Sequence, residues 1–186
     1  MLLEMRTVVT LLLVCGACRA EPLRFWVEAC AQGSTACLPG DPDLASWAME
    51  AWEKASAGKL TLVKTGDPDK AQIRFHWVGP REGMYGETRG GDVYVRPSIA
   101  PPAGRDSLLR DAVVYLTCLH ESGHALGFPH TAAFDDIMYN FQYGGDLVEY
   151  FARYRRKLGK REDIRSHSGL SEPDRARLRE IYGKSP

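Results

Sequence analysis

The stretch HESGHALGFPH, residues 120–130, decides how this sequence is interpreted. It contains three of the chain's five histidines, with a glutamate beside the first. On a helix, His120 and His124 lie about 40° apart around the axis and about 6 Å apart along it, so both imidazoles can bind one metal ion. Glu121 points about 100° away from His120, which makes it a poor third ligand but leaves it near a metal-bound water. Zinc suits this set, because it takes neutral imidazole nitrogens in a tetrahedral geometry with one position left for water.

His130 can join the other two histidines only if the helix ends before it. In a continuous helix it would lie about 15 Å along the axis from His120, far beyond a zinc–nitrogen bond of about 2.0–2.1 Å. Two residues can end the helix. Gly127 can adopt a positive φ, and Pro129 cannot continue a helix and disfavours the α conformation at Phe128. The sequence therefore predicts a three-histidine site, with the active-site helix ending at Gly127.

The composition is that of an ordinary globular domain. The chain has 186 residues, 44% of them apolar and 26% charged, which suffices for one domain with a core but not for two. Its 24 basic and 24 acidic residues give a formal net charge of zero. This balance argues against a nucleic-acid-binding protein or one that binds an anionic membrane surface. A monomer is expected.

The first twenty residues, MLLEMRTVVTLLLVCGACRA, have the layout of a secretory signal peptide. A short basic segment precedes an apolar run over 8–14, which is too short to span a bilayer, since that needs about 20 residues. The favoured interpretation is cleavage after Ala20, which leaves 21–186 as a single secreted or periplasmic domain. In the alternative, Cys18 resembles a bacterial lipoprotein acylation site, and only this lipidation would place the protein at a membrane.

Export changes the interpretation of the cysteines. In an oxidising compartment, Cys30 and Cys37 are expected to form a disulfide across the loop of small residues between them. Cys118 lies two residues before His120, about 200° around the helix, and should face away from the histidine site. We interpret it as a buried, free thiol.

Hydrophobic periodicity predicts strands with one helix among them, followed mostly by helices. Helical spacing of apolar residues predicts helices over 41–58, from Asp106 into the histidine motif, and over 146–158. Strand-like runs cover 23–29, 60–65, 71–78 and two segments joined by Gly90 and Gly91. This pattern predicts an α+β fold in which helices pack against a mixed sheet.

The full pattern His120-Glu121-x-x-His124-x-x-Gly127-x-x-His130 resembles the extended zinc motif of the metzincin metallopeptidases. Downstream, DIMY places Met138 where that family has its Met-turn, a tight turn beneath the zinc site. Thr131 and the segment LSEPDRARLREIYG at 170–183 resemble the matrixin branch. The resemblance covers most of the chain after residue 20, although only the zinc motif and the Met-turn are highly specific.

This resemblance implies the metzincin catalytic-domain fold, with a twisted mixed five-stranded sheet, three main helices and one catalytic zinc ion. The zinc ligands would be His120, His124 and His130. The protein would be a secreted zinc-dependent endopeptidase, in which Glu121 takes a proton from the zinc-bound water and passes it to the leaving amine. A peptide substrate would bind along an edge strand at about 83–89. Residues 139–145 would border the pocket for the side chain after the scissile bond.

The chain also departs from the animal matrix metalloproteinase pattern. The predicted signal peptide leads directly into the catalytic domain without a pro-segment, which is typical of a bacterial-style enzyme. The histidine-rich loop that holds a second zinc is missing, and His76 and His167 are interpreted as structural. Asn140 replaces the proline that often follows the Met-turn. Residues 141–169 form a long insert, and its basic residues from 153 to 161 are expected on a solvated helix face.

Two other classes of function are consistent with the motif. One is a zinc hydrolase of a non-peptide amide or ester, and the other is a non-catalytic secreted module with a structural zinc. A structural zinc site normally has four protein ligands, whereas this sequence offers three, which favours catalysis. No residue pattern supports or excludes a structural calcium ion.

Overall fold

A five-stranded sheet and four α-helices form the part of the chain that the computed structural model describes, residues 21–31, 35–81, 85–98 and 105–183. The predicted signal peptide, with Cys18, lies outside these residues. The strands are β1 (Leu23–Val27), β2 (Leu62–Lys64), β3 (Ile73–Trp77), β4 (Gly86–Arg89) and β5 (Asp92–Val95). The helices are α1 (Asp41–Ala55), α2 (Ser107–Ala125), α3 (Leu147–Arg155) and α4 (Glu172–Gly183).

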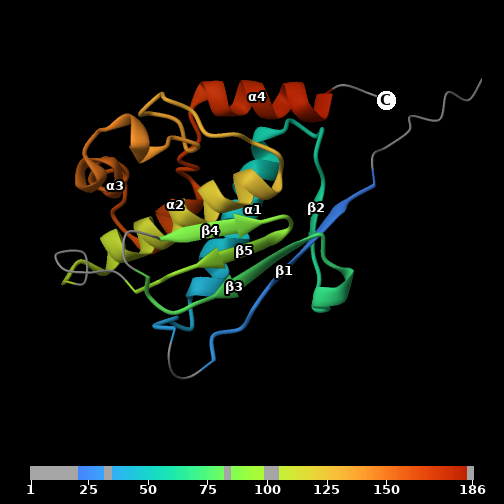
Figure 1. Ribbon diagram of the computed structural model, residues 1–186, viewed down its shortest axis with the longest axis horizontal. Helices are drawn as coiled ribbons and strands as arrows, with labels where there is room; N and C mark the ends of the chain where they lie inside the picture. Colours follow the sequence, from blue (N-terminus) through green and yellow to red (C-terminus); the bar gives the residue numbers. More distant parts are fainter. Residues whose placement is uncertain (1–20, 32–34, 82–84, 99–104, 184–186) are drawn as a thin grey trace, which may run out of the picture.

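The sheet is mixed, as the sequence predicted, with the strand order β2-β1-β3-β5-β4. All neighbouring strands are parallel except β4, which runs antiparallel to β5 and forms one edge of the sheet. Along β3, Ile73, Phe75 and Trp77 are buried and alternate with half-buried residues, the two-residue period of a strand that packs one face on a core. Edge strand β4 lies beside α2 in Figure 1.

Helices α1 and α2 lie together against the sheet (Figure 1). A buried indole joins them, because Trp52 Nε1 on α1 donates to the carbonyl of Leu119 at 3.1 Å and to the hydroxyl of Ser122 at 3.0 Å. Their contact surface makes up much of the core. The position of α2 is therefore fixed on two sides, by α1 and by strands β4 and β5.

The helices lie where the sequence predicts them, but their lengths differ from the predicted ones. The expected three main helices correspond to α1, α2 and α4, and the insert adds the nine-residue α3 as a fourth. The helix predicted over 41–58 ends at Ala55, because Ala57 and Gly58 adopt positive φ angles of 51° and 82°. The helix predicted over 146–158 is shorter, since it ends at Arg155.

The cysteines of the described residues occupy two environments. A disulfide joins Cys30 and Cys37, just before α1. Cys118, on α2, is a free and fully buried thiol, and burial raises its pKa well above the ordinary value. No helix in the described ranges combines the length and apolar character that a membrane-crossing helix requires.

Candidate metal centre

The three motif histidines converge on one point at the C-terminal end of α2. The Nε2 atom of His130 lies 3.3 Å from Nε2 of His120 and 3.1 Å from Nε2 of His124. Three ligands at about 2.0–2.1 Å from a tetrahedral zinc ion would be separated by about 3.3–3.4 Å. These residues therefore fit a zinc ion. Within the described ranges, the cluster contains no fourth histidine, cysteine or carboxylate ligand.

A local turn brings His130 back toward the helix. The last helical residue is Ala125, and Gly127 follows in the left-handed region with φ of 91°. The N–H of Gly127 donates to the carbonyl of His124, and that of Phe128 to the carbonyl of Gly123, both at 2.9 Å. These two bonds form a Schellman motif, the standard glycine-dependent end of a helix. The helix thus ends two residues before Gly127, and Gly127 makes the turn.

The outer nitrogens of the two helical histidines are held by backbone carbonyls. His120 Nδ1 lies 2.6 Å from the carbonyl oxygen of Ile137, and His124 Nδ1 lies 2.8 Å from that of Phe128. A carbonyl only accepts, so each Nδ1 must carry the hydrogen and donate it. Each Nε2 therefore keeps its lone pair for a metal ion, which is the usual outer contact of a zinc-binding histidine.

His130 differs from the other two ligands. Its Nδ1 lies 2.9 Å from Nδ2 of Asn140, while Oδ1 of the same amide accepts the N–H of Gln142 at 2.9 Å. Nδ1 of His130 thus faces the amide NH2, which can only donate. If Nε2 of His130 bound zinc, Nδ1 would carry the hydrogen, and two donors would then face each other. Zinc binding then requires the amide of Asn140 to rotate and to release Gln142. This contact could not be predicted from local sequence patterns.

Burial favours the neutral form of His120 and His130. It lowers the pKa of His120 to about 4 and also lowers the pKa of His130, in both cases because a charged imidazolium is poorly solvated there. Neutral imidazole is the form that binds metal ions. His120 and His130 therefore favour the metal-binding form at neutral pH.

Glu121 lies beside the histidines but is not one of the clustered ligands. Its side chain is buried, with a hydroxyl partner, since Thr88 Oγ1 on β4 lies 2.8 Å from its Oε2. Burial raises the pKa of Glu121, and the Thr88 contact opposes that rise. A Cβ at Gly86 would lie 2.5 Å from Cγ of Glu121, so β4 approaches α2 this closely only with glycine there. Neither Thr88 nor Gly86 was identified from the sequence.

Met138 is fully buried under the histidine motif. A Cβ at Gly123 would collide with its sulfur atom, which explains the glycine inside the motif. The N–H of Thr131 donates to the carbonyl of Met138 at 2.8 Å, and the N–H of Asn140 donates to the carbonyl of Thr131 at 3.1 Å. The Met-turn and the segment after His130 are thus paired through their backbones.

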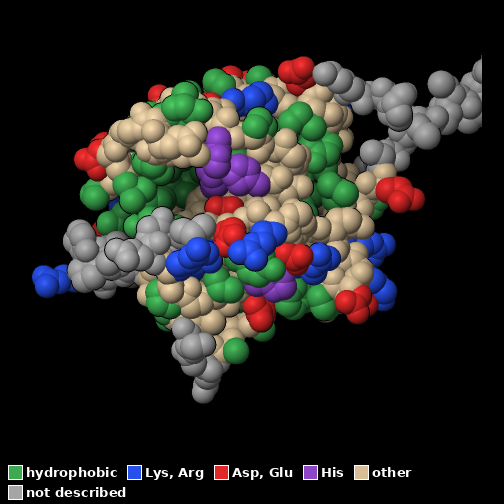
Figure 2. Space-filling model, viewed as in Figure 1, with side chains coloured by type: hydrophobic (Ala, Val, Ile, Leu, Met, Phe, Trp, Pro, Cys, Tyr) green, Lys and Arg blue, Asp and Glu red, His purple; other side chains and the backbone are tan. Residues whose placement is uncertain are grey.

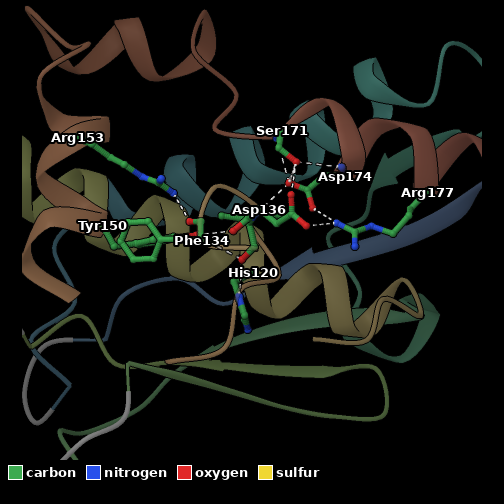
Figure 3. Close-up of polar contacts among 9 residues, drawn as sticks. His120, Phe134, Asp136, Tyr150, Arg153, Ser171, Asp174 and Arg177 are labelled. Atoms are coloured by element: carbon green, nitrogen blue, oxygen red, sulfur yellow. Dashed lines mark hydrogen bonds and ion pairs between the residues drawn. The ribbon is translucent and has the colours of Figure 1, made fainter. Parts of the chain in front are cut away.

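Side chains from α3 and α4 hold the Met-turn (Figure 3). Asp174 Oδ2 accepts the N–H of Ile137 at 2.8 Å, and Arg177 bridges Asp174 and Asp136 at 2.9 and 2.5 Å. From α3, the hydroxyl of Tyr150 donates to the carbonyl of Asp136 at 3.1 Å. Because the carbonyl of Ile137 also accepts from His120, this buried network orients a ligand.

A cavity of about 430 Å³ opens beside the histidines and Glu121. Figure 2 shows histidine side chains at a hollow of the surface, with an acidic side chain beneath them. Much of its lining is aromatic or aliphatic, and comprises Tyr85, Leu116, Tyr139, Phe141, Leu147, Tyr150 and Phe151. Part of the predicted segment 139–145 borders the cavity, as do Tyr85 and Gly86. Residues 83 and 84 of the predicted substrate strand lie outside the described ranges.

The two remaining histidines lie elsewhere. His76 Nε2 is 2.9 Å from a carboxylate oxygen of Asp92 on the sheet, and His167 Nδ1 is 2.9 Å from the carbonyl of Asp163. The bonds from Arg74 and His76 lower the pKa of Asp92 to about 2. Neither histidine belongs to the metal-ligand cluster.

Comparison with known proteins gives a fold and nothing finer. No protein-family model and no curated protein matches the sequence. Among solved structures, the chain is similar to an archaemetzincin from Methanopyrus kandleri, with a TM-score of 0.52 and 15% sequence identity. The match covers 89% of this chain and 98% of the other. The chain therefore has an α+β fold similar to that of this archaemetzincin, and the likeness does not single out the matrixin branch.

Proposed function

We propose that the protein is a zinc-dependent endopeptidase of the metzincin type, closest in plan to the matrixins. One observation carries the proposal: three histidine nitrogens spaced for zinc lie next to a buried glutamate that is not part of the cluster. A site with three protein ligands leaves a position open for chemistry, whereas structural zinc sites are closed by four. His120, His124 and His130 would hold the single ion.

Glu121 is the proton carrier in this proposal. Zinc, when bound, lowers the pKa of a water molecule and polarises the peptide carbonyl. Glu121 accepts a proton from the attacking water and delivers it to the leaving amine. Burial raises its pKa, which moves a carboxyl group toward the range in which it can both take up and release a proton near neutral pH. The Thr88 hydroxyl holds the carboxylate in place.

The substrate would be an extended peptide. Strand β4 is an edge of the described sheet and pairs with β5 on one side, so its other side can add a peptide strand. The neighbouring cavity of about 430 Å³ falls in the range of small-molecule sites. Its aromatic lining suits a large apolar side chain on the residue after the scissile bond, and α3 of the insert supplies part of that lining.

Export of the enzyme belongs to the same proposal. The layout of residues 1–20 and the disulfide between Cys30 and Cys37 support a secreted or periplasmic location. The matrixin assignment is supported by Thr131 and by the segment 170–183. In the lipoprotein alternative, Cys18 would carry the anchor.

Cleavage assays with Glu121→Gln test the proposal. The amide is nearly isosteric, so the variant should keep its fold and one zinc per chain, yet lose peptide cleavage by at least about 10²–10⁴-fold, the usual contribution of general acid–base catalysis. Glu172→Gln is a matched control, because Glu172 is an exposed ion-pair partner of Arg179 on α4. The control should cleave like the wild type.

The same assay separates the two other classes. Peptide-library and simple ester substrates are offered side by side to zinc-loaded protein. A non-peptide hydrolase would turn over only the esters or non-peptide amides, again dependent on Glu121. A zinc-loaded wild type that cleaves neither would instead be a module with structural zinc, and the proposal would be abandoned.

A further inference from the structure

A second cavity, of about 450 Å³, lies between α3, the segment 166–171 and the start of α4. We name it the basic cleft. It shares Leu116 and Tyr150 with the cavity at the histidines and has otherwise different walls. Its charged lining contains three cations, Arg153, Lys157 and Arg175, and one acid, Asp135. The lining is therefore positive, although the whole chain has no net charge.

All five arginines of the basic run 153–165 are matched by carboxylates. The pairs are Arg153–Asp135, Arg155–Asp106, Arg156–Glu149, Arg161–Asp111 and Arg165–Glu50. This pairing explains how a run of positive charge is accommodated on the surface. A cation that lacks a carboxylate partner in this region is therefore a candidate for binding an anionic ligand.

Two cations of the basic cleft have no such partner among the described residues. Lys157 forms no ion pair there, and Arg175 donates to the hydroxyl of Ser168 at 2.6 Å without reaching a carboxylate. The third cation, Arg153, is fixed in place, because its guanidinium stacks 4.7 Å from the ring centres of both Phe134 and Tyr150. The cleft therefore combines one fixed cation with two unpaired ones.

Part of the lining of the cleft is apolar. Leu116, Tyr154 and Leu170 line it and are buried. The hydroxyl of Tyr154 donates to the carbonyl of His167 at 2.5 Å, which ties the segment 166–171 to α3. Arg175 is half-buried, so its charge is screened less than a charge on an open surface, whereas Lys157 is exposed.

From this arrangement we propose that the basic cleft binds a small oxyanion, the carboxylate or phosphate group of a ligand, between Lys157 and Arg175. Both groups accept several charge-assisted hydrogen bonds, which ammonium and guanidinium groups donate. The hydroxyl of Ser168, already in contact with Arg175, can donate another. The site is separate from the proposed peptidase chemistry and does not depend on it.

Calorimetric titration of the zinc-loaded protein at low ionic strength tests the site, with inorganic phosphate and succinate as separate probes. We expect saturable binding of at least one probe, with one site per chain. Lys157→Ala and Arg175→Ala should each weaken it about 10-fold, the usual effect of losing one charge-assisted hydrogen bond. Lys160→Ala is the matched control, because Lys160 belongs to the same run but does not line the cleft; it should bind like the wild type.

Each outcome decides the proposal. Binding of phosphate alone or succinate alone supports it and identifies the preferred oxyanion. Arg175→Lys, which keeps the charge, should bind more tightly than Arg175→Ala, and a thermal melt of each variant shows that it is folded. Absence of saturable binding for both probes overturns the proposal. Equal weakening by Lys160→Ala also overturns it, because the attraction would then belong to the whole basic surface.

Discussion

The two turns that border the histidine cluster differ in how much of their support comes from distant side chains. The turn that follows α2 is closed mainly by backbone bonds between residues three to five positions apart, around Gly127, with one distant bond from the hydroxyl of Tyr182 to the carbonyl of Leu126 at 3.1 Å. The Met-turn is held by side chains 14 to 41 positions away, from Tyr150 on α3 and from Asp174 and Arg177 on α4. The first turn places His130 in the cluster, while the second orients His120 through the carbonyl of Ile137.

This difference separates the position of the ligands from their orientation. Spacing along eleven residues suffices to bring three histidines together. The direction of the His120 ring depends on a buried polar network that reaches the C-terminal helix. The insert and α4 are therefore part of the metal centre, although neither supplies a ligand.

Removing the main support of the Met-turn should have the largest effect. Asp174→Ala leaves the buried N–H of Ile137, the hydroxyl of Ser171 and the guanidinium of Arg177 without their shared partner. Breaking a buried ion pair from one side typically costs about 3–5 kcal/mol. We expect a loss of that size in the free energy of unfolding, measured by urea denaturation.

Two control variants calibrate that loss. Gly127→Ala places a side chain at a positive φ with open space around it, and should cost only about 1 kcal/mol. Asp92→Ala removes the partner of Arg74 and His76 in a two-point but partly exposed pair, and should cost about 2 kcal/mol. The contrast between the turns is wrong if Asp174→Ala costs no more than these two.

Acid should destabilise the metal-free protein through His120. Its pKa is about 4 in the folded state, against an ordinary value of about 6.5. Between these values the unfolded chain binds more protons than the folded one, so stability falls as pH decreases from about 6.5 to about 4. The loss should reach up to about 3 kcal/mol. Urea unfolding with a chelator present, at several pH values, measures it.

A His120→Leu variant isolates that pH effect from the titration of carboxyl groups. The free energy of unfolding of the wild type minus that of the variant should decrease as the pH falls from about 6.5 to about 4, because only the wild type carries His120. A difference independent of pH would show that the folded structure does not hold His120 neutral.

A substitution at the contact between Asn140 and His130 should strengthen zinc binding. In Asn140→Asp, one carboxylate oxygen can accept the N–H of Gln142 while the other accepts Nδ1–H of His130, so zinc binding no longer requires an amide to rotate. Outer contacts of this kind usually change metal affinity by about 10–100-fold. Zinc affinity, measured by competition with a chromophoric chelator, should rise by that factor. Asn140→Ala should gain less, because it removes the amide but supplies no acceptor for Nδ1–H, and equal affinities for Asp and Asn would contradict the proposed orientation.

Features that depend on local signals could be predicted from the sequence, whereas features that depend on distant side chains could not. The Gly127 turn, the boundaries of α2 and the five strands depend on local signals, namely helix-ending residues and apolar periodicity. Thr88 next to Glu121 and the Asp136–Arg177–Asp174 network depend on contacts between elements far apart in the chain. No local pattern encodes which carboxylate meets which arginine, so these residues became visible only in the folded structure.

The zinc ligand set is tested most directly by X-ray absorption at the zinc edge of the purified protein, together with its metal content. We predict one zinc per chain, with three imidazole nitrogens at about 2.0–2.1 Å, no sulfur ligand and a further light-atom ligand that inhibitor binding alters. In His130→Ala the imidazole count should fall to two, and zinc affinity should fall by more than the about 10–100-fold expected of an outer contact. A sulfur ligand, four imidazoles, or an unchanged spectrum in His130→Ala would contradict the open three-histidine site.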